Sequence, residues 1–260
     1  MAASARFAAL VQGPESDLPL DEAALLLAAH GDPALDVGAA LGGLDALAAR
    51  VPSPTAAGVR SLLFGELGLR GNRADYGDPR NSYLHLVIER RLGIPITLAL
   101  AVIVVGRRVG VTFEGLGMPG HFLARGEGVI IDPFDGGREL DEAGCATVFR
   151  GLFGPDAVFA PELLAPVGPR AILARMLANL RQSFAGRGDR RGLEWSTRLA
   201  LDIPGLPPAE VGELARLLTN LGRFAEAADA LERLAATPAV PPGESTRLRA
   251  TAASLRARLN

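Results

Sequence analysis

The chain has 260 residues, of which 48% are hydrophobic and 22% charged, and its formal net charge at pH 7 is −2. This length suits one large domain or two smaller ones with a sizeable core, and the small charge gives no general attraction to nucleic acid or to an anionic membrane. All 27 basic residues are arginines. The absence of lysine excludes a Schiff-base enzyme and a P-loop, because both depend on that side chain.

The sequence gives no sign of a membrane segment or a secretion signal. Its longest apolar run, Leu98 to Val105, would span about 12 Å as a helix, far less than a bilayer core. The residues after Met1 lack the basic start and sustained apolar stretch of a signal peptide. A single cysteine, Cys145, excludes an internal disulfide and a Cys-rich metal site. We therefore expect a cytoplasmic protein.

The first part of the chain predicts helices. Leu, Ala and Val recur at spacings of three and four over residues 20–50, and a further helix is predicted over 56–67. The segment NSYLHLVIERRLG predicts another, with Asn81 or Ser82 as its N-cap and Gly93 just after its end.

A long apolar helix is predicted next, from Pro95 to Val109. Proline suits the first turn of a helix, where its missing N–H has no partner in any case. Apolar residues surround this helix for most of its length, and a helix of that kind is buried on most sides. We therefore expect it to be the core helix of its domain.

After residue 110 the pattern changes to short β-like runs separated by glycines, VTFEGLG, HFLAR and GVIIDPF. They predict a small antiparallel sheet against the core helix, so the fold class of this region is α+β. The following segment, LDEAGCATVFRGLFG, predicts a helix in which Cys145 is a buried, inert thiol.

A histidine and an aspartate are predicted to meet across a hairpin. If Gly126 and Glu127 form a two-residue type II′ turn, His121 lies opposite Asp132 in the neighbouring strand. Directly opposed side chains on one face are close enough to interact. The carboxylate would then accept the Nδ1–H of the imidazole, fix its tautomer and stabilise its charged form.

The C-terminal part of the chain repeats itself. A Pro-rich stretch, residues 156–168, precedes it, and each repeat reads as a helix, a Gly turn, a second helix and a proline. Equivalent positions are 34 residues apart, which is the period of tetratricopeptide repeats. The pairs are Leu177 and Val211, Leu180 and Leu214, Gly188 and Gly222, Ala200 and Leu234, and Pro204 and Pro238. A last helix, from Glu244 to Leu259, would cap the array.

Four motifs, DPRNSYL, RRLGIPITLALA, GMPGHFL and IDPFDGG, resemble the SirB-type transglutaminase-like proteins of bacteria. The resemblance covers about residues 20–260. It implies a papain-like domain with a buried helix and a small antiparallel sheet, residues 1–165, and an all-α tetratricopeptide-like domain, residues 166–260. In that fold a cysteine nucleophile opens the buried helix, and His121 and Asp132 match the family's catalytic histidine and aspartate.

The sequence departs from the family pattern at the position of the nucleophile. Counting back from Gly110, the expected position falls at or beside Pro95, and no cysteine lies near it. Thr97, one turn inside the helix, is the nearest substitute, but a neutral hydroxyl would need full general-base help. Ser82 is a second candidate whose capping role is sufficient explanation. We expect Thr97 to bond a backbone carbonyl one turn earlier, or a neighbouring turn, as helical threonines commonly do.

Other polar residues receive structural interpretations. Asn72, Asp78 and Asn81 are expected to hold turns and helix starts, and His30 and His85 are expected to be structural or exposed. Three scattered histidines do not predict a zinc site. No helix follows the glycines of GMPGHF, so no phosphate-binding loop is predicted, and we expect neither a metal nor a cofactor.

Three functional hypotheses follow. The first is a degenerate transglutaminase-like domain that acts as a binding or regulatory module, a pseudoenzyme whose helical repeats hold an unidentified protein partner. The second is a hydrolase or acyl-transfer enzyme that uses His121 and Asp132 with Thr97 or an activated water. The third is a structural scaffold. The first is favoured by the missing nucleophile together with the repeat pattern.

Overall fold

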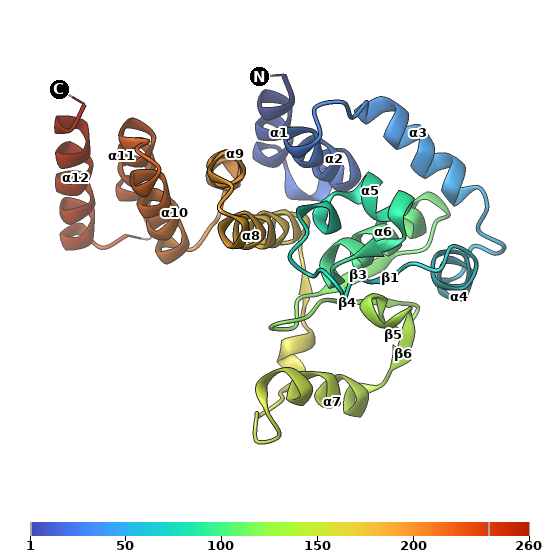
Figure 1. The fold of residues 1–260 in the computed structure, drawn as a ribbon. Helices are drawn as coiled ribbons and strands as arrows, with labels where there is room; N and C mark the ends of the chain where they lie inside the picture. Colours follow the sequence, from blue (N-terminus) through green and yellow to red (C-terminus); the bar gives the residue numbers. More distant parts are fainter. Residues whose placement is uncertain (1, 239, 260) are drawn as a thin grey trace. The chain divides into compact units, whose positions relative to one another are not determined.

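The computed structural model describes residues 2–238 and 240–259, which divide into two compact units (Figure 1). The first unit reaches Asn179 and the second begins at Leu180. The division falls inside helix α8, Pro169–Arg187. The domain boundary at residues 165 and 166 stays a prediction.

Seven α-helices precede α8 in the described residues of the first unit. They are α1 (Ala2–Gln12), α2 (Leu20–Gly31), α3 (Val37–Ala48), α4 (Ala56–Arg60), α5 (Leu84–Arg90), α6 (Pro95–Arg108) and α7 (Glu142–Phe153). After α4 the helix widens into a π-helical segment, η2 (Ser61–Glu66), so the predicted helix over 56–67 is present in two geometries.

A five-stranded antiparallel sheet forms the β layer of this unit. Its strand order is β6-β5-β4-β3-β7. The strands are β3 (Phe113–Leu116), β4 (Leu123–Gly126), β5 (Val129–Asp132), β6 (Arg138–Leu140) and β7 (Pro166–Val167). A separate parallel pair joins β1 (Arg70–Gly71) to β2 (Leu92–Gly93). The predicted α+β class with a small antiparallel sheet is confirmed.

Helix α6 is the core of the first unit. Every residue from Pro95 to Val102 is buried, and the helix contacts β3 and β4 of the sheet (Figure 1). Its apolar sequence on all sides is explained by neighbours on several sides, since α2, α3, α4 and α5 also contact it. The predicted core helix is confirmed.

The ends of α5 differ from the prediction. Asn81 and Ser82 lie in a 3₁₀ turn, η3 (Pro79–Ser82), and not at the N-cap of α5. At the other end Arg91 takes the left-handed conformation, with φ of +60°, and ends the helix. Gly93 instead pairs in β2. A side chain at Gly93 would lie 2.9 Å from Val87 and 3.0 Å from Leu98, so the glycine serves close packing.

In the described residues of the second unit, all regular secondary structure is α-helical. After α8 come α9 (Arg190–Asp202), α10 (Pro208–Asn220), α11 (Phe224–Ala235) and α12 (Pro242–Ala257). A core of buried leucines and alanines joins α10, α11 and α12, with members such as Leu218, Leu231 and Leu255. Left-handed glycines make the tight turns before α9 and α11, at Gly188 and Gly222.

No helix in the described part of the chain combines the length and the apolar character that a membrane crossing needs.

Candidate functional site around His121 and Asp132

A tight turn places His121 beside the sheet. The backbone N–H of His121 donates to the carbonyl of Met118 at 3.1 Å. Between them lie Pro119 and Gly120, and Gly120 has a φ of +69°. Proline followed by a left-handed glycine is the sequence of a type II turn. A Cβ at Gly120 would lie 3.2 Å from Phe153, a tight contact that a small movement of this exposed ring relieves. The positive φ is therefore the reason for glycine at this position.

The hairpin between β4 and β5 turns one residue later than predicted. Gly126 pairs with Val129, so the turn residues are Glu127 and Gly128, with φ of +50° and +81°. Positive φ at both positions is typical of a type I′ turn, whose twist matches that of the flanking strands. The predicted type II′ turn over Gly126 and Glu127 is wrong, and with it the register that set His121 directly opposite Asp132.

The side chains of His121 and Asp132 meet despite the changed register. Nε2 of His121 lies 2.9 Å from Oδ1 of Asp132, and the two side chains are only 8% and 4% exposed. The same oxygen accepts the backbone N–H groups of Phe134 and Asp135, at 3.0 and 3.3 Å. The predicted contact therefore exists, but it uses Nε2 where we expected Nδ1. An imidazole held in this way has a fixed orientation and a carboxylate to stabilise its charged form.

The other ring nitrogen of His121, Nδ1, is available to a ligand or to water. Nδ1 makes no hydrogen bond with the described residues, and it is not among their fully buried side-chain atoms that lack a partner. This nitrogen therefore keeps contact with solvent. It can accept a proton or donate one, which is the requirement for a general acid or base and also for a ligand-binding group.

Phe134 forms an aromatic platform beside the histidine. Its ring meets His121 edge to face with centroids 6.0 Å apart, and it meets Tyr76 in the same manner at 5.9 Å. The guanidinium of Arg73 lies 5.0 Å from the centroid of the same ring. Arg73 also pairs with Asp135 at 3.3 Å. Polar and charged groups thus surround one apolar surface.

Arg175, in the part of α8 that belongs to the first unit, holds the turn that carries the histidine. Its Nη2 donates to the carbonyls of Met118 and His121, at 2.9 and 2.5 Å. Its guanidinium lies 5.3 Å from the centroid of Phe122. Burial lowers the pKa of Arg175, and Tyr76 opposes that shift. Burial likewise raises the pKa of Tyr76, and Arg175 opposes it.

The start of α6 carries no ionisable nucleophile. Pro95 is its first residue, and Thr97 is fully buried. The Oγ1 atom of Thr97 has no hydrogen-bond partner among the described residues. The expected bond to a carbonyl one turn earlier is therefore wrong. That carbonyl belongs to Gly93, and it accepts the N–H of Asn72 at 2.9 Å.

Cys145 lies away from this helix start. It is the fourth residue of α7, fully buried among Leu116, Met118 and Leu123. Burial, with a contribution from Asp141, raises the pKa of the Cys145 thiol to about 11. Since only the thiolate is a good nucleophile, Cys145 is unreactive at neutral pH.

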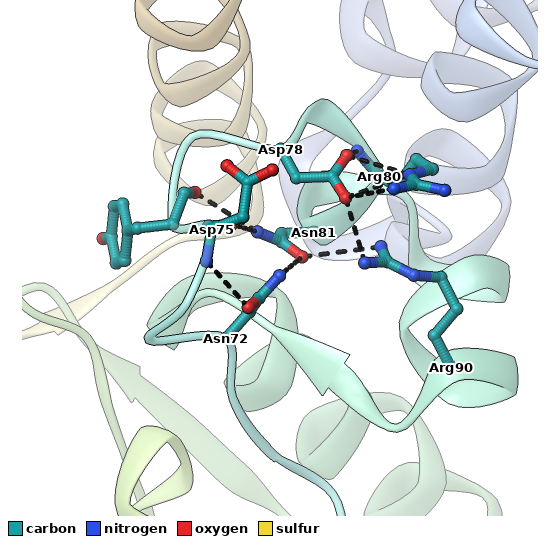
Figure 2. Close-up of polar contacts among 7 residues, drawn as sticks. Asn72, Asp75, Asp78, Arg80, Asn81 and Arg90 are labelled. Carbon is teal, nitrogen blue, oxygen red and sulfur yellow. Dashed lines mark hydrogen bonds and ion pairs between the residues drawn. The ribbon is translucent and has the colours of Figure 1, made fainter.

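A buried polar network supports the residues before α6, as Figure 2 shows. The side chain of Asn81 accepts from Asn72 Nδ2 at 3.0 Å and donates to the carbonyl of Asp75 at 2.8 Å. Asp78, only 4% exposed, pairs with Arg80 and Arg90 at 2.8 and 3.0 Å.

The charge of Asp78 is well compensated. Burial raises its pKa, but the hydrogen bonds from Arg80 and the charges of Arg90 and Arg80 outweigh burial and hold the pKa below its ordinary value. The backbone carbonyl of Asn81 also accepts the N–H of Ile94 at 3.4 Å. The network thus ties the DPRNS segment to the start of α6, in agreement with the structural interpretation of these residues.

The remaining histidines have structural partners. His30 contacts Ser4 Oγ at 2.8 Å and the carbonyl of Leu26 at 2.9 Å. His85 contacts Asp32 at 3.1 Å. In the described ranges no three His, Cys, Asp or Glu side chains gather as metal ligands would.

Two site residues were not identified from the sequence. Tyr76 and Arg175 reach the surroundings of His121 from distant segments, and no motif marks either of them. The Pro119-Gly120 dipeptide did offer a signal, because it predicts a type II turn and hence a fixed carbonyl pair around the histidine. It does not identify the donor that binds those carbonyls.

Known proteins provide an independent comparison. The family model described as the transglutaminase-like superfamily matches residues 37–178. Among curated proteins, a UPF0162 protein of Xylella fastidiosa is 39% identical over 186 residues, which cover 65% of this chain and 66% of the relative. A second UPF0162 protein, from another strain, is 42% identical over 162 residues, which cover 59% and 57%.

The same region is also similar to part of a longer eukaryotic protein. F-box only protein 21 of Mus musculus is 33% identical over 178 residues, which cover 64% of this chain and 27% of the relative. No solved structure matches the chain. The matched region spans about two thirds or less of each of these relatives. Because the family model covers more than half of the sequence and includes α6, His121 and Asp132, the chain belongs to the transglutaminase-like superfamily.

Proposed function

We propose that the protein is a SirB-type member of the superfamily whose transglutaminase-like domain lacks the thiol nucleophile and acts as a binding or regulatory module. In this proposal the helices after residue 165 are tetratricopeptide-like repeats that hold a protein partner. The contact between His121 and Asp132 then serves recognition and stability rather than thiol catalysis.

One observation carries the proposal. The position from which a cysteine would attack, the first turn of α6, begins with Pro95. The thiol that the chain does possess, Cys145, is buried in α7 with a pKa raised to about 11. Neither residue provides a thiolate next to an imidazole at neutral pH.

The helical unit supports the repeat part of the proposal. Helices α9 and α11 begin at Arg190 and Phe224, and α10 and α12 at Pro208 and Pro242, so equivalent helices start 34 residues apart in both cases. Ion pairs also join α11 to α9 and to α12. Arg198 of α9 pairs with Glu226 of α11 at 2.5 Å, and Arg256 of α12 pairs with Glu232 of α11 at 2.8 Å.

The comparison with the mouse protein supports modular use. There the similar region occupies about a quarter of a much longer chain. A domain that recurs in chains of different length and composition is a unit that can be combined with other parts. This is compatible with a binding module and does not identify the partner.

A second function, hydrolysis or acyl transfer, is favoured by a different pair of observations. Nδ1 of His121 keeps contact with solvent, and the buried Oγ1 of Thr97 lacks a partner. A histidine oriented by a carboxylate can activate a hydroxyl or a water. In this alternative Thr97 or a water takes the role of the missing thiol.

An assay of catalytic activity with the whole chain distinguishes the two proposed functions. Wild type, Thr97→Val and His121→Ala are assayed against amide and ester substrates, with circular dichroism and thermal unfolding as a check that the first unit, which carries both substitutions, is folded. The binding-module proposal expects no turnover by any of them. Turnover by the wild type that both substitutions abolish, with folding unchanged, would establish the enzyme.

The repeat part of the proposal has its own test. Proteins retained by the wild-type chain are compared with those retained by His121→Ala and by Arg223→Glu. Arg223 is a half-exposed residue that pairs with Glu194 at 2.7 Å. A partner retained by His121→Ala and lost with Arg223→Glu supports binding through the helical unit. The reverse pattern places the partner on the first unit and contradicts the proposal.

A further inference from the structure

Arg175 is a charged side chain that lacks a counter-charge. It makes no ion pair with any carboxylate of the described residues, although its environment is desolvated enough to lower its pKa. Asp78, a buried charge of the same unit, is compensated differently, since it is paired with two arginines. A partly buried charge without a partner is costly, so an external anion would offset that cost.

The guanidinium also has donors to spare. Both hydrogen bonds of Arg175 to the 118–121 turn use Nη2. Its Nε and Nη1 bond no described residue and are not among the fully buried unpartnered atoms. A guanidinium presents its N–H groups in a planar fork that matches the two oxygens of a carboxylate. The turn contacts hold that fork in place and reduce the entropy lost on binding.

The groups around Arg175 suit an anion as well. Tyr76, which interacts electrostatically with Arg175, is 48% exposed. Nδ1 of His121 faces solvent, and the carbonyl of the same residue accepts from Arg175. The nearby carboxylates interact with other residues. Asp132 pairs with His121, and Asp135 pairs with Arg73 and Arg138. Asp75 interacts electrostatically with Arg80.

Apolar surface lies beside these polar groups. Phe134 contacts both His121 and Tyr76. On the other side of the turn, Phe153 and Leu152 pack against Gly120 and are still 53% and 50% exposed. Exposed aromatic and aliphatic side chains next to a charged donor are typical of a recognition site for an amphipathic ligand.

We propose that Arg175, Tyr76 and His121 form a binding site for a carboxylate attached to an apolar group. The fork of Arg175 takes the carboxylate, and the hydroxyl of Tyr76 donates to it. Because Nε2 of His121 already donates to Asp132, Nδ1 donates to the ligand in the doubly protonated form of the imidazole. The apolar group lies on the aromatic surface. This site belongs to the first unit and is independent of partner binding by the helical repeats.

The test uses the ¹⁵N-labelled full chain and four probes: N-acetylphenylalanine, its amide, acetate and inorganic phosphate. We expect saturable shifts of the backbone signals of residues 118–122 and 134 with N-acetylphenylalanine. The uncharged amide should bind about tenfold more weakly or worse, which is the loss expected for one charge-assisted hydrogen bond. Acetate should be weaker as well, because it lacks the apolar group, and phosphate should not compete.

Variants locate the site. Arg175→Gln should weaken N-acetylphenylalanine about tenfold, and Tyr76→Phe about threefold. Arg60→Gln is the matched control, because it removes one positive charge of the same unit from a half-exposed pair with Glu139, and it should leave binding unchanged. If Arg175→Gln fails to fold, the affinity of Tyr76→Phe and the comparison of N-acetylphenylalanine with its amide still test the proposal.

Two peptides distinguish the sources of the carboxylate. One ends in a free phenylalanine carboxylate, and the other is amidated and carries an internal Glu-Phe pair. Saturable binding of either one supports the site and identifies a chain end or an acidic side chain as its ligand. Equal binding of the acid and its amide, equal binding of phosphate, an unchanged affinity in Arg175→Gln, or no binding of any carboxylate probe at tens of millimolar would overturn the proposal.

Discussion

Arg175 and His121 are linked through the backbone: Nη2 of Arg175 lies 2.5 Å from the carbonyl oxygen of His121. The same nitrogen reaches the carbonyl of Met118, so one side chain closes the turn that these two residues begin and end. The imidazole of His121 is fixed from its other side by Asp132. The histidine is therefore held by two elements far apart in the sequence, and it contacts solvent through Nδ1.

The first prediction concerns the energy of the histidine–aspartate pair. His121→Ala should lower the free energy of unfolding by about 1–3 kcal/mol, because it leaves the buried carboxylate of Asp132 with only its backbone donors. In a double-mutant cycle with Asp132→Asn, the two changes should be coupled by about 1 kcal/mol or more. Thermal and urea unfolding of the four proteins measures this. Additive effects would mean that the contact contributes no net stability.

The second prediction concerns the unpartnered hydroxyl of Thr97. Thr97→Val replaces that buried hydroxyl by a methyl group of similar size, and it should raise the free energy of unfolding by about 1 kcal/mol. The matched control is Thr197→Val. Thr197 is equally buried, but its Oγ1 donates to the carbonyl of Leu193 at 2.6 Å, so the same change there should be destabilising. A loss of stability in Thr97→Val would show that the hydroxyl has a partner.

The core helix and three of the strands, β3, β4 and β5, could be predicted from the sequence because each depends on local pattern. The short strands β1, β2, β6 and β7 were not predicted. The apolar surroundings of α6 follow from its composition, and its first residue follows from the fixed φ of Pro95. The strands follow from short β-branched and aromatic runs between glycines. These features are decided within a few residues, and the structure places them within a few residues of the prediction.

The hairpin register could not be decided from residue types alone. Glycines flank Glu127 on both sides, so a two-residue turn can begin at Gly126 or at Glu127. The structure uses the second. Type I′ and type II′ turns both suit the twist of the strands, so the turn geometry alone does not choose between them. Glu127 has a second contact there, since its carboxylate accepts the N–H of Ala56 at 2.9 Å. That contact spans 71 residues and is invisible to a local pattern.

Only the part of the candidate site that depends on nearby residues was predicted from the sequence. His121 and Asp132 are close in the sequence and lie at the ends of a hairpin, so their proximity survives the error in register. Arg175 and Tyr76 are brought to the site by the paths of α8 and of the loop before η3. Those paths depend on packing of the whole unit, which no spacing within a motif records.

The third prediction uses the raised pKa of Cys145. A thiol whose folded-state pKa is raised contributes stability that is fully present below its unfolded pKa and is lost as the pH rises through the folded value. Here the window runs from the ordinary value of 9.0 to about 11. Across it the stability of the wild type relative to Cys145→Ala should fall by about 2–3 kcal/mol. Below pH 8 the difference should be constant, and a slope there would contradict the assignment.

The last prediction tests whether Pro95 occupies the place of the missing nucleophile. In a Cys145→Ser background, Pro95→Cys introduces a thiol at the first residue of α6, where the helix N-terminus and the imidazole of His121 would stabilise a thiolate. Alkylation by iodoacetamide at pH 7 should be about tenfold faster than that of the same cysteine in the unfolded protein. Adding His121→Ala should remove most of that gain.

Thr97→Cys in the same background is the matched control. It places a thiol in the same buried helix, two residues beyond the first position, and should react more slowly because the field of a helix N-terminus falls off within the first turn. The rates of alkylation, followed by mass spectrometry with unfolded protein as the reference, give the comparison directly. A thiol at position 95 that reacts no faster than this control, or whose rate is insensitive to His121→Ala, would place the imidazole out of reach of the helix start. The protein would then not be a thiol enzyme that has lost its nucleophile at Pro95.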